Sequence, residues 1–249
     1  MTTRKKYFIE LSYKGTNYHG WQIQPNALTV QEVLDKALGI FFRQKIETLG
    51  CGRTDTGVHA SQFFAHCEID ISSFNQDKAI QSINSILPFD ISVKRFIEMP
   101  PQSHARFDAT LRSYEYHIHY AKDPFLHDFS WLIRDRLDVK TMNIASAYLL
   151  NYTDFSCFSK SNTQVFTNNC KISQAEWIEV NDGLIFYISA DRFLRNMVRA
   201  IVGTMVDIGR GKIGPDEIHT IIRSKNRSNA GTSVPACGLY LTKVNYPYI

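Results

Sequence analysis

The order in which strand-like and helix-like segments follow one another most constrains how this chain can fold. Alternating apolar residues rich in β-branched and aromatic types predict strands, and apolar residues at every third or fourth position predict helices. In the first part of the chain these patterns give strand, helix, strand, strand, helix and strand. The predicted segments are Tyr7–Tyr13, Thr29–Phe42, Ile46–Cys51, Ala60–Ile69, Asp77–Leu87 and Ile91–Glu98.

The second part repeats this order with one additional helix. Its segments are Arg112–Tyr120, Val139–Leu150, Lys171–Val180, Leu184–Ala190, Phe193–Ile208, Pro215–Ser224 and Leu239–Tyr246. The Asn-Asp-Gly turn before Leu184 predicts a hairpin. Two β-α-β-β-α-β units predict an α+β protein with two ferredoxin-like halves, residues 1–105 and 106–249, that place their sheets side by side.

Composition bounds the class of protein. Of 249 residues, 44% are hydrophobic and 21% charged, which favours a packed core over disorder. The net charge of +4 raises the odds of a nucleic-acid partner only slightly. The five cysteines are dispersed without a Cys-x-x-Cys pair, which argues against a thiolate zinc site and indicates a reducing cytoplasm. No apolar run reaches the ~18 residues that a membrane span requires, and we expect no secretion signal.

The stretch GCGRTDTGVHA, Gly50–Ala60, places a carboxylate on a flexible turn between two predicted strands. Asp55 lies two residues after Arg53, and an adjacent guanidinium favours the ionised acid. An ionised carboxylate in a cleft is a competent nucleophile or base, whereas the structural alternative is an ordinary β-turn aspartate. The phosphate-loop pattern is absent. Cys51 and His59 lack a third group that would orient them as a nucleophile and base.

A second stretch, RFDATLRSYEYHIHY, combines cations with rings. Because alternate residues of a strand share a face, Arg112, Tyr114 and Tyr116 project together, and Arg106 lies shortly before them. Such a face suits the stacking of a nucleobase and the binding of a phosphate. The alternative is a sheet surface whose tyrosines pack in the core.

A third stretch is the apolar-striped helix predicted at Phe193–Ile208. Arg195 and Arg199 lie one turn apart at the edge of its stripe, where a guanidinium can reach a semi-buried carboxylate or face solvent. Residues 224–233 are rich in Asn, Ser and Gly, and we expect a mobile loop there. Basic residues in or beside that loop, which suit contact with a phosphate backbone or plain solvent exposure, are Arg223, Lys225 and Arg227.

Six segments together, in this order, resemble the tRNA pseudouridine synthase A family. They are YKGTNYHGWQIQPNALTVQEVLDKAL, GCGRTDTGVHA, NSILPFDI, SHARFDATLRSYEYHI, FLRNMVRAIVG and CGLYLTKVNY. The resemblance extends from about Tyr7 to Tyr246. It implies a pseudouridine synthase fold with a largely antiparallel central sheet and a cleft between the two halves. It also implies an enzyme that isomerises uridine to pseudouridine at positions 38, 39 and 40 of the tRNA anticodon stem-loop.

The resemblance further implies that the enzyme needs no metal or organic cofactor and forms a homodimer that embraces the tRNA. The essential aspartate of the family falls on Asp55, its active-site tyrosine on Tyr114, and the arginine that pairs with the aspartate on Arg199. Leu239 falls on the leucine that lines the pocket.

These assignments fit the chemistry, in which a detached uracil must be retained and turned. We expect Asp55 to act as the nucleophile, attacking either ribose C1′ or uracil C6, with Arg199 holding the carboxylate ionised. Tyr114 stacks the base and is a candidate to assist removal of the C5 proton, and Leu239 forms an apolar wall. The expected substrate-binding residues besides Tyr114 and Leu239 are Arg53, Arg106 and Arg195.

Two positions depart from the family pattern. Cys170 stands in TQVFTNNCKI where family members often carry an arginine after a threonine, and Asn151 stands where a glycine is frequent. Both departures concern how the second half contacts RNA. Two alternatives remain open from the sequence: a non-catalytic tRNA-binding or tRNA-folding protein on the same scaffold, and a synthase that acts on other RNA uridines.

Overall fold

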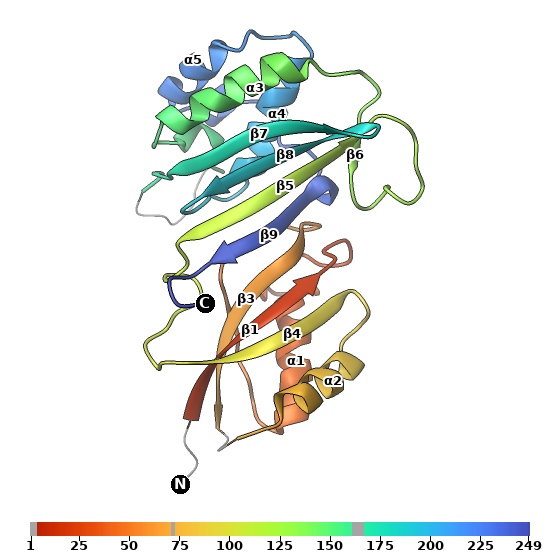
Figure 1. The fold of residues 1–249 in the computed structure, drawn as a ribbon, viewed down its shortest axis with the longest axis vertical. Coiled ribbons are helices and arrows are strands. Elements are labelled where there is room, and N and C mark those ends of the chain that lie inside the picture. The colour runs from red at the N-terminus through yellow and green to blue at the C-terminus, as the bar shows by residue number, and fades with distance from the viewer. Residues whose placement is uncertain (1–3, 71–72, 161–166) are drawn as a thin grey trace. The chain divides into compact units, whose positions relative to one another are not determined.

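The computed structural model describes residues 4–70, 73–160 and 167–249 of a mixed α/β protein whose strands pair mostly antiparallel (Figure 1). The chain divides into two compact units. Met1–Thr110 and Leu241–Ile249 form the first unit, and Leu111–Tyr240 form the second.

The first unit is built around strand β1 (Arg4–Tyr13), which pairs antiparallel with β3 (His59–Asp70) and with β4 (Ile91–Met99). The two-residue strand β2 (Leu49–Gly50) pairs with β3. Strand β9 (Leu239–Asn245), most of which belongs to this unit, is the other neighbour of β3. In the strand order β4-β1-β3, strand β1 therefore lies between β3 and β4.

Two helices of the first unit begin and end where the local sequence dictates. Helix α1 (Val30–Phe42) begins after Thr29, whose hydroxyl accepts the Glu32 N–H at 3.4 Å. Helix α2 (Gln76–Ile86) is capped by Asn75 and ends shortly before a proline.

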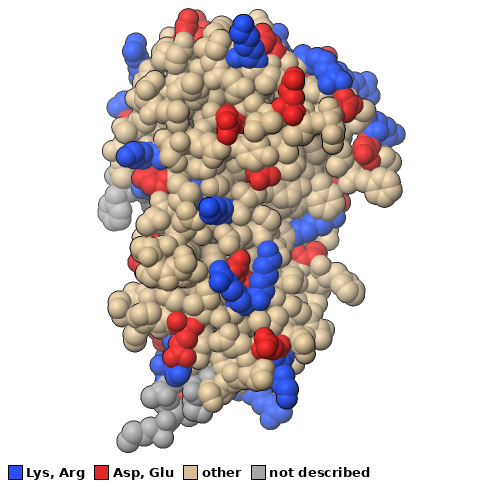
Figure 2. Space-filling model, in the orientation of Figure 1, with Lys and Arg blue, Asp and Glu red and all other residues tan. Residues whose placement is uncertain are grey.

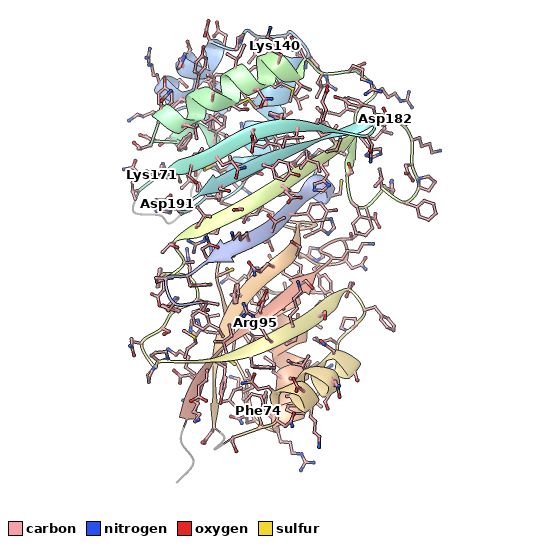
Figure 3. The ribbon with its side chains drawn as sticks, viewed as in Figure 1. Phe74, Arg95, Lys140, Lys171, Asp182 and Asp191 are labelled. Atoms are coloured by element: carbon pink, nitrogen blue, oxygen red, sulfur yellow. The ribbon has the colours of Figure 1, made fainter. Side chains whose placement is uncertain are left out.

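An aromatic cluster joins these helices to the sheet. Phe74, labelled in Figure 3, lies edge-to-face against Tyr7 at 5.2 Å, Phe42 at 5.2 Å and Phe96 at 5.4 Å. Rings from β1, α1 and β4 thus meet around one side chain, in the edge-to-face geometry that aromatic pairs prefer.

The second unit has strand β5 (Leu111–His119) paired antiparallel with β8 (Gly183–Ala190), which pairs antiparallel with β7 (Ile172–Val180). The short strand β6 (Trp131–Leu132) runs parallel to β5. Figure 1 shows helices on one side of β7 and β8. They are α3 (Val139–Tyr148), α4 (Met197–Gly209) and α5 (Glu217–Ser224). The unit also contains 3-10 turns η1 (Leu149–Asn151), η2 (Ser156–Phe158), η3 (Arg227–Asn229) and η4 (Ala236–Gly238).

The predicted elements are confirmed with three differences, and the short strand β6 is an additional element that no sequence pattern predicted. The strand predicted at Ile46–Cys51 is reduced to two residues. The helix predicted from Phe193 begins at Met197, because Asn196 adopts the left-handed conformation, with φ 66°, and so breaks the helical path.

The third difference concerns residues 224–233, which are held by side-chain contacts instead of forming a free loop. The Arg227 guanidinium donates to the carbonyl oxygens of Ala230 at 3.3 Å and Gly231 at 3.0 Å. Lys225 pairs with the carboxylate of Asp154 at 2.8 Å. Two of the cations expected to be available to phosphates therefore have contacts within the fold.

Charged side chains of both signs are interspersed on the face seen in Figure 2. The five cysteines are free, and four are buried. Within the described ranges, no helix has the length and apolarity to cross a membrane. The same residues contain no group of three or more His, Cys, Asp or Glu side chains placed to hold a metal ion.

Candidate active site

The loop between β2 and β3 carries Arg53, which is exposed, and Asp55, which is half-buried. The Asp55 carbonyl oxygen accepts the Val58 N–H at 3.1 Å and closes a turn. Gly57 occupies the left-handed region of this turn with φ 79°. A residue with a side chain would resist that conformation, so one glycine of the motif has a defined local role.

This loop lies against a second loop of the same unit, residues 14–21, which follows β1. The Trp21 N–H donates to the Thr54 carbonyl oxygen at 3.4 Å, and the Gly57 N–H donates to the Tyr18 carbonyl oxygen at 3.2 Å. The two loops thus form backbone hydrogen bonds with one another on both sides of Asp55. This contact fixes the backbone from which the carboxylate projects.

Glycines make the approach of the two loops possible. A Cβ atom on Gly20, which has φ 86°, would lie 2.2 Å from the Thr54 carbonyl oxygen. A Cβ atom on Gly15 would lie 2.0 Å from the Val58 carbonyl oxygen. By contrast, a Cβ atom on Gly52 meets nothing within 4 Å.

The loop after β1 is in turn tied to the connection between α2 and β4. The Asp90 carboxylate accepts the Tyr18 hydroxyl at 2.5 Å, and the Asp90 carbonyl oxygen accepts the Lys14 N–H at 2.9 Å. Our reading of the sequence assigned no role at the site to Gly15, Tyr18 or Gly20. A sequence feature that could have indicated this loop is the pair of glycines among aromatic residues in YKGTNYHGW, which precedes the predicted helix.

In the second unit, Tyr114 on β5 is half-buried and lies edge-to-face with Phe193 at 5.2 Å. Tyr116 has 0% exposure and donates its hydroxyl to the Pro235 carbonyl oxygen at 2.8 Å. The expectation that both tyrosines present rings to a ligand is therefore wrong for Tyr116, which packs in the core. Tyr114 keeps a partly open ring supported by Phe193.

The strand end beside Tyr114 is held by Asp191, labelled with Lys171 in Figure 3. The Asp191 carboxylate accepts the Lys171 N–H at 2.7 Å, and its carbonyl oxygen accepts the Arg112 guanidinium at 2.8 Å. Arg112 is thus engaged by the backbone of the neighbouring strand end.

The two departures from the family pattern lie in this unit. Cys170 is buried, its N–H donates to the Thr153 carbonyl oxygen at 2.8 Å, and burial raises the pKa of its thiol to about 12. It therefore serves as a protonated core residue. Asn151 is exposed in η1. Residues 163–166 of the segment around Cys170 lie outside the described part of the chain.

Arg199 lies in the first turn of α4 and is half-buried. Its Nε donates to the Val234 carbonyl oxygen at 2.7 Å, and its own carbonyl oxygen accepts the Val234 N–H at 3.3 Å. Arg195 is exposed and precedes the helix. The expectation that these two arginines stand one helical turn apart is therefore wrong.

The segment that contacts Arg199 continues to Leu239, which is buried. A Cβ atom on Gly203 of α4 would lie 1.9 Å from the Thr232 carbonyl oxygen, so this segment lies directly on the helix. A Cβ atom on Gly238 would lie 2.9 Å from the Tyr116 ring. The second unit therefore brings Arg199 and the residues leading to Leu239 into one connected region.

Arg106 is exposed and lies in a turn of the first unit that two histidines hold. The Nδ1 atom of His104 accepts the N–H groups of Arg106 at 3.1 Å and Phe107 at 3.2 Å. The Nδ1 atom of His66 accepts the Ala105 N–H at 3.2 Å. Each imidazole must be unprotonated at Nδ1 to accept these bonds.

The environment of His66 favours the neutral ring. The pKa of His66 is lowered to about 4, chiefly by burial and then by the positive charges that His104 and Lys6 can carry, against the smaller opposing effects of Glu68 and Asp108. The ring is therefore neutral near pH 7, as its hydrogen bond requires.

Comparison with known proteins shows the family to which this chain belongs. A family model described as tRNA pseudouridine synthase matches residues 145–247. A protein of Bacteroides fragilis named tRNA pseudouridine synthase A is 49% identical over 98% of this chain and 97% of its own length. Two further relatives have the same name. The protein of Parabacteroides distasonis is 46% identical over 98% of this chain and 96% of its own length. The protein of Clostridium acetobutylicum is 38% identical over 97% of this chain and 100% of its own length. The chain belongs to the tRNA pseudouridine synthase A family.

Substitution of Gly20 by Ala tests the contact between the two loops. We expect Gly20→Ala to lower the free energy of unfolding by about 2 kcal/mol or more, because the new Cβ meets a backbone oxygen and the residue has positive φ. Gly52→Ala is the matched control, and we expect a change within about 0.5 kcal/mol. Urea denaturation measures both values. Equal stability of the two variants would contradict the proposed role of the contact.

The His66 ring gives a second prediction, concerning pH. Because the folded pKa lies below the unfolded value of about 6.5, the unfolded state binds more protons and stability falls as the pH drops from about 6.5 to about 4. His66→Asn retains an acceptor oxygen but does not titrate. We expect the stability of wild type relative to this variant to fall in that window by up to about 2 kcal/mol, since solvent screens the half-buried ring. Urea denaturation at each pH measures the difference, and parallel pH profiles would contradict it.

Proposed function

We propose that this protein isomerises uridine to pseudouridine at positions 38, 39 and 40 of the tRNA anticodon stem-loop. The observation that carries the proposal is the near-full-length similarity to proteins named tRNA pseudouridine synthase A, at up to 49% identity in the relatives described above. The loop with Arg53 and Asp55 supports it, since a half-buried carboxylate on a fixed backbone suits nucleophilic chemistry.

The reaction requires that the N1–C1′ glycosidic bond break, that the uracil turn, and that C5 bond to C1′. C5 loses a proton and N1 gains one, so the product is an isomer of the substrate. Asp55 is the proposed nucleophile, with attack at C1′ or C6 both open. Arg199 is the proposed partner that keeps this carboxylate ionised. No metal or organic cofactor enters the proposal, as the resemblance to the family implies.

Tyr114 is the proposed stacking residue for the everted base. Its ring is partly exposed, and Phe193 at 5.2 Å supports it from the side. Leu239 is the proposed apolar wall that retains the detached uracil. Tyr114 is also a candidate to assist removal of the C5 proton.

Arg53, Arg106 and Arg195 are the proposed cations that hold the RNA, and all three are exposed. Turning a paired or stacked base outward costs a few kcal/mol, which contacts to the surrounding phosphates offset.

The proposal includes two ferredoxin-like halves, residues 1–105 and 106–249. In the first unit, the pairing of β1 with both β3 and β4, and of β2 with β3, supports the first half. The proposed protein is a homodimer. Its proposed location is the cytoplasm, where tRNA is found and where free thiols such as the five cysteines here persist.

Replacement of Asp55 by Asn separates chemistry from binding. We expect Asp55→Asn to abolish pseudouridine formation in unmodified tRNA while tRNA affinity stays within about tenfold, or ~1.4 kcal/mol. The measurements are pseudouridine mapping without added cofactor and filter binding. Wild-type protein that modifies no position among 38, 39 and 40 would overturn the proposed substrate specificity, and an active variant would remove Asp55 from the mechanism.

A further inference from the structure

A column of rings runs from the core of the first unit to its surface. Phe8, with 0% exposure, stacks on His66 with ring centroids 6.0 Å apart and an interplanar angle of 25°. His66 meets His104 edge-to-face at 4.8 Å with an angle of 66°, and His104 meets Phe107 at 4.3 Å with an angle of 31°. The last ring, Phe107, is 74% exposed.

The turn that presents Phe107 is held from several sides. The Asp108 carboxylate accepts the His104 N–H at 2.7 Å and the Tyr248 hydroxyl at 2.6 Å. The Ala105 carbonyl oxygen accepts the Tyr246 hydroxyl at 2.6 Å. These contacts fix the backbone that carries Phe107, so little backbone freedom of the turn remains to be lost when a partner binds.

The charges around this ring favour an anionic partner. The Arg106 guanidinium lies 5.7 Å from the centroid of Phe107, and Lys6 extends its amine to the Pro101 carbonyl oxygen in the same region. The acidic groups nearby already have partners. Asp108 accepts bonds from His104 and Tyr248, as above, and Glu68 forms ion pairs with Arg4 at 3.0 Å and Lys6 at 3.8 Å. An exposed ring with a guanidinium beside it matches the way proteins hold unpaired nucleotides, with the base on the ring and the phosphate on the cation.

The turn lies well away from Asp55 along the sheet. His66, which supports the turn, is seven residues further along β3 than His59, where the strand begins after the Asp55 loop. At ~3.3 Å per residue this corresponds to roughly 23 Å. A nucleotide that stacks on Phe107 is therefore a different one from the uridine that would react at Asp55.

We propose that Phe107 is a stacking platform for an unpaired base of the tRNA, distant from the modified uridine, and that Arg106 binds the adjoining phosphate. This rests on the proposed function for the identity of the RNA. The contact of Phe107 with His104, which His66 and Phe8 support from the core, positions the ring for a base on its exposed side.

Two variants test the platform. Phe107→Leu keeps an apolar side chain and removes the aromatic face, whereas Phe107→Trp keeps it. With unmodified tRNA, we expect Phe107→Leu to raise Kd and KM by about 5- to 150-fold, the range for loss of one base–aromatic stack, with kcat unchanged within about twofold. Phe107→Trp should restore both constants to within about threefold of wild type. An unchanged Kd in Phe107→Leu, or equal losses in both variants, would overturn the platform.

A protein partner for this ring is the competing outcome. Sedimentation equilibrium of the RNA-free Phe107→Leu variant should give the same oligomeric state as wild type, and a change would assign the ring to an interface between protein chains and overturn the proposal. Filter binding in the Asp55→Asn background isolates affinity from chemistry. Absence of pseudouridine in wild-type reactions would defeat the proposed function alone, while the difference in Kd between Phe107→Leu and Phe107→Trp would still decide the platform.

Discussion

The close contact between the loop after β1 and the loop after β2 is the constraint on which the first part of the candidate site depends. Gly20 and Gly15 let two backbones approach to distances at which any Cβ would collide with a carbonyl oxygen. Hydrogen bonds from Trp21 to Thr54 and from Gly57 to Tyr18 then fix the loop on both sides of Asp55. A carboxylate on an otherwise glycine-rich turn thereby gains a defined position, which preorganised chemistry requires.

The second unit uses the same device. Gly203 allows residue 232 to lie directly on α4, and the following residues bond Arg199 through Val234. The guanidinium of Arg199 is therefore oriented by a backbone carbonyl as well as by its helix. In both units a side chain of the candidate site projects from a backbone that is held by a close contact with a segment distant in the sequence.

Much of the fold follows from local pattern. The strands at β1, β3, β4, β5 and β9 and the helices α1, α2 and α3 begin or end within a few residues of their predicted bounds, because periodicity and capping residues such as Thr29 act over short distances. The motif around Asp55 was also evident, as an acid among glycines. Its significance came from resemblance, since an aspartate in a turn has the same local signature whether it is catalytic or structural.

Local patterns were enough to predict most of the order of strands and helices, and the six motifs were enough to indicate the family. They could not show that Tyr116 is buried while Tyr114 stays partly open, that Asn196 breaks the helix before Arg199, or that Arg227 holds its own segment to the fold. Burial and side-chain hydrogen bonding depend on which distant segments pack together. Residue type and spacing alone do not specify those partners.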